Sequence, residues 1–274
     1  MVGTVLMAAV APAVALAVLW RGWRRPGHGF LDVWQSRFDV EVPDDERAFV
    51  TTRLLRGRRI RAAGVAVGVG VAGVPSYMNL IDPSRAADFA NPLVGNAWMF
   101  GATVGGLLAE ALVVQRPRVR RATLEVRRAR DYTDRRFVIA VYAAVPLTLV
   151  LASISTILGG HRWWFSWFGV AGAGVAAAGV ALGLRAIVDR PALAPEGIAR
   201  DVDDALRADG ALRLVGTAVA LAAMGVSTSL PHGAPGGWSF VHVVFGYVSL
   251  LGLVWWWSLA RDVRWSVPRA RALT

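Results

Sequence analysis

The chain of 274 residues is 55% hydrophobic and only 18% charged, with a mean hydropathy of +0.46, whereas a soluble domain carries about 25% charged residues. This composition excludes an ordinary soluble protein and indicates a membrane protein. All 30 basic residues are arginine and the formal net charge is +11. That balance would suit nucleic-acid binding, but the arginines crowd the ends of apolar stretches, as orientation signals do, so we expect no nucleic-acid partner.

A helix that crosses roughly 30 Å of hydrocarbon needs about 20 apolar residues. Seven stretches satisfy this requirement, and we predict an all-α, polytopic bundle of seven transmembrane helices in a single transmembrane domain over residues 1–274. The first stretch is an anchor and not a signal peptide, because its arginines follow the apolar residues instead of preceding them. The predicted spans are approximately 2–20, 62–81, 91–114, 137–158, 163–188, 214–230 and 239–260.

Residues 21–61 form the longest polar stretch, with ten arginines and six acids. Pro43 followed by Asp44, Asp45 and Glu46 is typical of the first turn of a helix, where acids meet the positive end of the dipole. Beyond it, apolar residues recur between arginines at near-helical spacing. The pattern predicts a cytoplasmic basic segment with an amphipathic helix that lies on the inner membrane surface and runs into the next span.

The segment from Gln115 to Arg136 holds nine arginines against three acids and separates two predicted spans. Arginine near the end of a span is retained on the cytoplasmic side. The predicted outer loops contain Arg85 and Arg162, while nearly all other arginines fall in the segments placed inside. We therefore predict positive-inside topology, N-out and C-in, in the plasma (inner) membrane of a bacterium. Tryptophans at both predicted boundaries fit an aromatic belt, and the absence of lysine suggests a GC-rich genome.

The chain contains a short internal similarity: the residues at 114–117, Val-Gln-Arg-Pro, match Val-Asp-Arg-Pro at 188–191. This predicts a possible three-fold repeat of helical hairpins after the first span, as occurs in some transporters and in plain structural duplications. Three spans also carry glycines one turn apart, which let helix backbones approach closely. We expect these glycines to pack within the chain, and a dimer or partner interface is the alternative. The pairs are Gly64 and Gly68, Gly101 and Gly105, and Gly179 and Gly183.

Glu110 is the one acid well inside a predicted span. A carboxylate in hydrocarbon is costly and marks a candidate functional residue by default. Our interpretation is a structural ion pair with Arg116 or with Arg185, and the alternative is a coupling or gating role. No other ionisable residue is predicted at mid-membrane depth, which argues against a proton relay.

An acidic cluster, Asp201, Asp203, Asp204 and Asp209, lies next to the sixth span. Lipid-processing transferases hold Mg²⁺ with aspartates in such a place, and the nearest pattern is that of the CDP-alcohol phosphotransferases. Here Ala205 stands at the position of their glycine and the later aspartates are missing. We therefore interpret the cluster as a solvated helix face. Residues 131–134 (Asp-Tyr-Thr-Asp) are expected to form local salt bridges.

Several other classes of site lack their required residues. A seven-span protein with an outer N-terminus suits a rhodopsin, but retinal needs a lysine and the chain has none. There is no cysteine, no Walker motif, no nucleophile elbow and no HExxH. The four histidines are not at ligand spacing, and we expect no catalytic residue, cofactor or metal. Polar residues in the spans either line a shallow outer cavity or form ordinary interhelical hydrogen bonds; they are Asn79, Asn96, Tyr142, Ser153, Ser155, Thr156, Ser227 and Thr228.

The run LLAEALVVQRPRVRRATLEVRRARDYTDRR, with AE followed by RP and an arginine-rich DY segment, resembles a pattern in integral membrane proteins of high-GC Gram-positive bacteria. It covers about a tenth of the chain. The resemblance implies the membrane localisation and carries no activity.

Three functions remain open from the sequence. The first is a membrane-embedded partner or accessory subunit, suggested by the basic cytoplasmic face and the lack of buried chemistry. The second is a small-solute transporter or permease, suggested by the hairpin pattern, Glu110 and the outer polar residues. The third is a lipid-modifying enzyme that uses the aspartate cluster. The inner arginines are also expected to attract anionic lipid head groups.

Overall fold

The computed structural model describes residues 2–24, 29–81, 97–113, 128–158, 165–190 and 200–230, and these ranges are all-helical. The predicted span at 239–260 and most of the arginine-rich segment lie outside the described residues. The α-helices are α1 (Val2–Trp23), α2 (Phe30–Phe38), α3 (Arg47–Ile81), α6 (Ala97–Val113), α7 (Arg135–Ile157), α8 (Phe165–Val188) and α9 (Arg200–Ser229), and a 3-10 turn, η1 (Ala129–Asp131), precedes α7.

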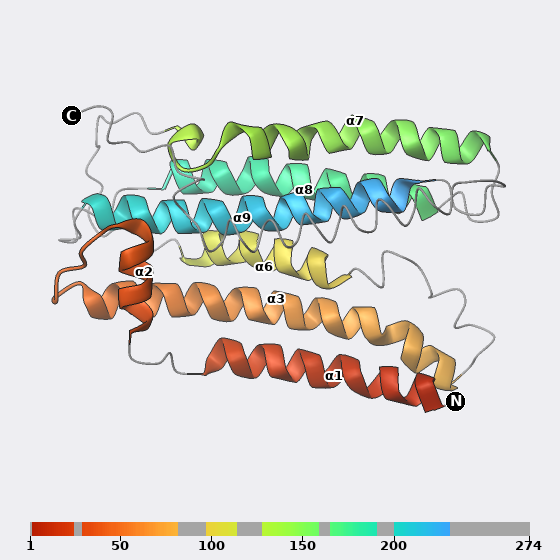
Figure 1. The fold of residues 1–274 in the computed structure, drawn as a ribbon, viewed down its shortest axis with the longest axis horizontal. Coiled ribbons are helices and arrows are strands. Elements are labelled where there is room, and N and C mark those ends of the chain that lie inside the picture. Colours follow the sequence, from red (N-terminus) through yellow and green to blue (C-terminus); the bar gives the residue numbers. More distant parts are fainter. Residues whose placement is uncertain are drawn as a thin grey trace.

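The six long helices lie side by side along the longest axis of the molecule, and consecutive ones run in opposite directions (Figure 1). α3 packs on α1 and on α6, while α9 packs on α6, α8 and α7. Because the directions alternate, the end of α1 and the start of α3 lie at one end of the bundle. The end of α8 and the starts of α7 and α9 lie there too (Figure 1). We call this the arginine-rich end, since arginines stand at or near each of these helix termini.

Three of the helices are long and apolar enough to cross a membrane. They cover Arg135–Ile157, Ser166–Val188 and Arg200–Ser229, with mean hydropathies of 2.4, 1.7 and 1.5. Apolar side chains point outward along α7, where Ile139, Leu147 and Val150 are exposed, as expected of a helix that faces lipid. The described residues of the first six ranges predicted to span are almost all helical, but the number of crossings, the orientation and the hairpin repeat stay predictions.

Two helices extend well past their predicted spans at the arginine-rich end. α3 has 35 residues and α9 has 30, so at about 1.5 Å per residue each is far longer than roughly 30 Å of hydrocarbon. The acidic segment before the predicted sixth span and the apolar residues of that span form one unbroken helix, α9. Local propensity carries the helix through, since residues 200–213 contain neither proline nor a β-branched run.

A small second core lies at the same end and joins three elements. α2 is bounded by two residues with positive φ, Gly29 at 89° and Asp39 at 53°, which turn the chain back onto α3. We use the name cap for α2, residues 39–46 and the first turns of α3 and α9. Its buried apolar side chains are Trp34, Val42, Val50, Leu54, Val202, Ala205 and Leu206.

Part of the predicted amphipathic stripe is buried within the protein. Val50 and Leu54 pack among side chains of α2 and α9, while the position of this helix relative to a membrane stays a prediction. The two residues are buried because α9 brings a matching apolar stripe, Val202 and Leu206, to the same place. Tertiary burial of both stripes satisfies the pattern without lipid.

The glycine pairs predicted to pack do so within the chain. A Cβ atom at Gly64 would lie 2.8 Å from the Gly105 Cα, and one at Gly101 would lie 3.1 Å from the Gly68 Cα, so α3 and α6 touch backbone to backbone. Gly179 and Gly183 face Leu107 of α6. The sequence analysis missed two further close approaches: Gly169 of α8 meets Gly225 of α9, and Gly22 of α1 meets Ala62 of α3.

Candidate functional site at the arginine-rich end

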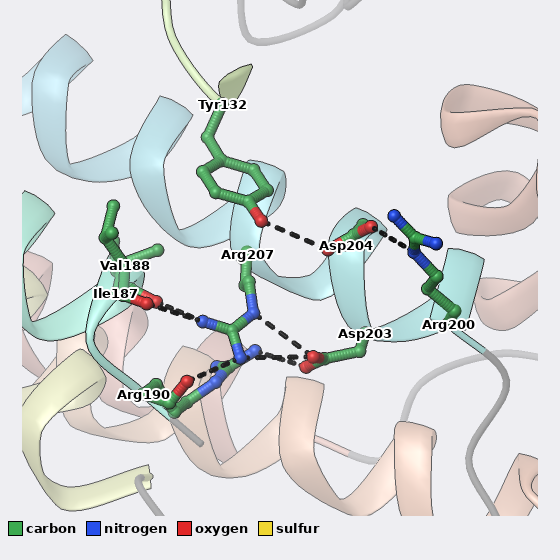
Figure 2. Close-up of polar contacts among 8 residues, drawn as sticks. All are labelled: Tyr132, Ile187, Val188, Arg190, Arg200, Asp203, Asp204 and Arg207. Carbon is green, nitrogen blue, oxygen red and sulfur yellow. Dashed lines mark hydrogen bonds and ion pairs between the residues drawn. The ribbon is translucent and has the colours of Figure 1, made fainter. Parts of the chain in front are cut away.

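Arg207, a completely buried arginine on α9, is the centre of the largest polar network in the described part of the chain. Its Nε and Nη2 atoms donate to Oδ2 of Asp203, one turn earlier, at 3.2 and 3.1 Å. The other oxygen of Asp203 accepts from Nη2 of Arg190 at 2.8 Å. Both partners are buried as well. Figure 2 shows the aspartate held between the two guanidinium groups.

The remaining edge of the Arg207 guanidinium closes the end of α8. Nη1 donates to the carbonyls of Ile187 and Val188, and Nη2 donates to the carbonyl of Arg190 at 2.7 Å (Figure 2). The last carbonyls of a helix have no partner inside it and carry partial negative charge. Arg207 therefore satisfies them with a positive charge from a different helix and fixes the end of α8 against α9.

The two buried arginines share the carboxylate of Asp203. Nε of Arg190 makes no hydrogen bond to any described residue. An arginine does not release its proton in a protein, so Arg190 and Arg207 cannot exchange protons with a substrate. What they can do is hold an anion or, as observed, hold Asp203 and the helix end.

A second contact ties α9 to the segment before α7. The Tyr132 hydroxyl donates to Oδ1 of Asp204 at 3.1 Å, and Nε of Arg200 lies 3.9 Å from the other oxygen (Figure 2). Asp134 caps α7 by accepting from the Arg136 amide at 2.8 Å. The Asp-Tyr-Thr-Asp segment was expected to form local salt bridges. In the structure it supplies a helix cap and this contact with α9.

The acidic cluster is not the solvated face that its sequence suggests. Asp203 and Asp209 are buried, and Arg213 donates from Nε to both oxygens of Asp209 at 2.9 Å. Asp201 alone of the four is exposed. Since three of the carboxylates are engaged by arginine or tyrosine, they do not converge on a common point. In the ranges described, no three histidine or acidic residues are placed to hold a metal.

A further group of arginines lies beside this network. Arg58 of α3 donates from Nη2 to the backbone carbonyl of Arg21, at the end of α1. Burial, followed by the positive charges of Arg21 and Arg213, lowers the pKa of Arg58 from its ordinary value. The three arginines come from three different helices, and the charges of Arg21 and Arg213 both act on Arg58.

The residues predicted as functional candidates are only partly described. Arg185 is 81% exposed at its side chain, and its Nε lies 3.3 Å from Oδ2 of Asp189, one turn later on the chain. Glu110 belongs to the last turn of α6, and its side chain lies outside the described residues, as does Arg116. Their pairing with one another stays a prediction. The four histidines also lie outside the described ranges.

Apart from Tyr142 and Ser227, the described residues with hydroxyl groups on α7, α8 and α9 use them in hydrogen bonds to protein. Ser166 donates to Ser155 at 2.8 Å, and Ser229 donates to the Ser166 carbonyl at 3.1 Å, which links all three helices. Ser153 and Thr228 bond to carbonyls of their own helices. The interhelical explanation therefore holds for Ser155 and Thr156, which accept from Ser166 and Trp167, whereas the bonds of Ser153 and Thr228 lie within one helix.

The sequence did contain a signal for the buried network. Asp203 and Arg207, like Asp209 and Arg213, are four residues apart, the spacing at which side chains on one helix face meet. No sequence pattern predicted the burial of Asp203 and Arg207, because that burial depends on the packing of the end of α8 against α9. Taken together, the described residues define an all-helical membrane protein with an ion-paired end. No protein-family model, curated protein or solved structure matches the chain.

Proposed function

We propose that this chain is a membrane-embedded partner or accessory subunit of the bacterial plasma membrane, with the cap and its arginines facing the cytoplasm. The observation that supports this most directly is the cap itself. Two helices continue past the apolar ranges to build it, and it has its own apolar core and a dedicated helix, α2. A structure of this kind outside the hydrocarbon has no use in merely crossing the membrane.

The outer surface of the cap suits a protein partner. On α2 the side chain of Val33 is 72% exposed, with Asp32 and Ser36 exposed beside it. Arg56 and Arg59 are exposed on the adjoining part of α3. An exposed apolar residue with charges of both signs nearby, Asp32 on α2 and Arg56 and Arg59 on α3, favours a protein partner of complementary charge, since charge complementarity steers association and selects the partner.

Photo-crosslinking in cells tests this proposal. A photoreactive amino acid in place of Val33 should give one discrete protein adduct, and Arg56→Glu with Arg59→Glu should weaken that adduct because charge complementarity with the partner would be lost. The same amino acid in place of Ile157, 82% exposed at the opposite end of the bundle, is the matched control. A chain that gives no adduct at Val33 and purifies alone in several mild detergents contradicts the proposal.

A transporter is the second candidate, and one observation favours it. Thr103 is fully buried near the middle of α6, and its hydroxyl makes no hydrogen bond to the described residues. Glu110 stands two turns further along the same helix. If Glu110→Gln abolishes a solute flux while the Val33 adduct persists, the transporter is the better description.

A further inference from the structure

The strongest unexplained feature is the group of arginines Arg21, Arg58 and Arg213, which come from α1, α3 and α9. We propose that they form a binding site for the phosphate of an anionic phospholipid. This goes beyond the proposed partner function and beyond the general attraction of arginines for anionic membranes, because it assigns one headgroup to one place.

Backbone contacts put two of these arginines at one depth. Gly105 of α6 lies against the backbone of Arg61, and a Cβ at the next residue, Gly106, would lie 3.9 Å from Oγ1 of Thr217. Arg61 and Thr217 are therefore level with each other across α6. Arg58 lies three residues before Arg61, and Arg213 lies four residues before Thr217. Each of these two arginines therefore lies about one helical turn further toward the arginine-rich end.

The third arginine is brought to Arg58 by the packing of α1. The contact of Gly22 with Ala62 places the last turn of α1 against α3. The Arg58 guanidinium donates a hydrogen bond to the backbone carbonyl of Arg21 and so closes the end of α1. The Arg21 side chain takes no part in this bond and is exposed. The lowered pKa of Arg58, caused by burial and then by Arg21 and Arg213, shows that these positive charges are close enough to repel.

Positive charge is in excess at this position. Asp209 is the carboxylate that meets Arg213, and neither Arg21 nor Arg58 forms an ion pair with a described residue. Uncompensated guanidinium groups in a half-buried place bind phosphate well, because the guanidinium fork matches its oxygens.

The neighbouring aromatic residues identify the source of the phosphate as a lipid. Trp20 and Trp23, in the same turn of α1 as Arg21, are 65% and 49% exposed, and Arg24 lies over the Trp20 ring at 5.2 Å. Exposed tryptophan with an adjacent arginine is typical of the headgroup level of a bilayer. A basic site between transmembrane helices at that level recognises anionic lipid headgroups. A freely dissolved phosphate would not need these rings.

The test measures lipid binding to the purified full chain in a neutral detergent by native mass spectrometry, with phosphatidylglycerol and phosphatidylcholine of the same acyl chains. We expect phosphatidylglycerol to bind preferentially. Arg58→Gln and Arg21→Gln should each weaken its binding about fivefold, the loss expected when one arginine near an anionic headgroup is removed. Arg21→Gln guards against misfolding, since the bond from Arg58 uses the backbone of Arg21 and survives the substitution.

The matched control is Arg185→Gln, an exposed arginine near the same end whose partner is Asp189. It should leave phosphatidylglycerol binding unchanged. The proposal is overturned if Arg21→Gln and Arg185→Gln weaken binding equally, or if phosphatidylcholine binds as tightly as phosphatidylglycerol. Inorganic phosphate that displaces phosphatidylglycerol at comparable concentration would show a site for a soluble anion and would overturn the lipid assignment.

Discussion

Arg207 combines three roles in one side chain: it pairs with Asp203, closes the end of α8 and fills the space between that end and α9. Burying a charge is tolerable only when every part of it has a partner. The sequence suggested a solvated face here because the acids and arginines alternate along α9 as they do on exposed helices. The structure differs from that expectation because the unsatisfied carbonyls at the end of α8 pack against α9. No local pattern in the α9 sequence predicts this contact.

Removing the shared carboxylate should be costly. Asp203→Asn would remove the carboxylate that Arg190 and Arg207 share while both arginines stay buried, and loss of one partner of a buried ion pair destabilises by about 3–5 kcal/mol. We expect a large fall in the midpoint of thermal unfolding in detergent. Asp201→Asn, at an exposed position on the same turn of α9, is the control and should shift the free energy of unfolding by no more than about 0.5 kcal/mol. Equal midpoints for the two variants would show that the network contributes nothing.

At the scale of the elements, the crossing of α3 with α6 depends on glycine. The i, i+4 glycines in the sequence predicted close packing correctly. The absence of a side chain allows a close backbone approach whichever helix is the neighbour. The lengths of α3 and α9 were harder to predict, because charged residues mark the end of an apolar stretch but do not end the helix. α2 was not predicted at all: its nine residues have no cap hydrogen bond from a side chain and owe their place to Trp34 in the cap core.

A methyl group at the α3–α6 crossing should separate the two helices. Gly101→Ala would bring a Cβ within 3.0 Å of the Gly64 backbone, and backbone atoms of two packed helices cannot move aside as a side chain can. We expect a lower unfolding midpoint in detergent. Gly70 lies on α3 away from the crossing, and a Cβ there would have no atom within 4 Å. Gly70→Ala should therefore be neutral or stabilising by about 0.5–1 kcal/mol, because alanine favours the helix. If both variants melt alike, the contact is not close in solution.

For the whole molecule, composition and apolar lengths were sufficient to predict an all-helical membrane protein, and the structure confirms that class. The order in which the helices pack could not be predicted. α3 lies against α1 and α6, while α9 lies among α6, α7 and α8, and such neighbour relations depend on the shapes of many residues at once. Orientation stays a prediction from the distribution of arginine.

Cysteine labelling tests the orientation directly, because the chain contains no cysteine of its own. Asp201→Cys and Leu158→Cys place exposed thiols at opposite ends of the bundle. In intact cells a membrane-impermeant maleimide should label Leu158→Cys, and it should reach Asp201→Cys only after the cells are permeabilised, because the arginine-rich end is retained inside. The reverse pattern would invert the topology and remove the proposed cytoplasmic cap.

The unbroken course of α3 has a mechanical consequence. Its first turns are fixed in the cap, and its middle touches α6 at Gly64 with no side chain between the backbones. A stiff rod held in this way acts as a lever, and a tilt applied at the cap changes the crossing angle deep in the bundle. Whatever contacts the cap is thereby connected mechanically to the crossing of α3 with α6.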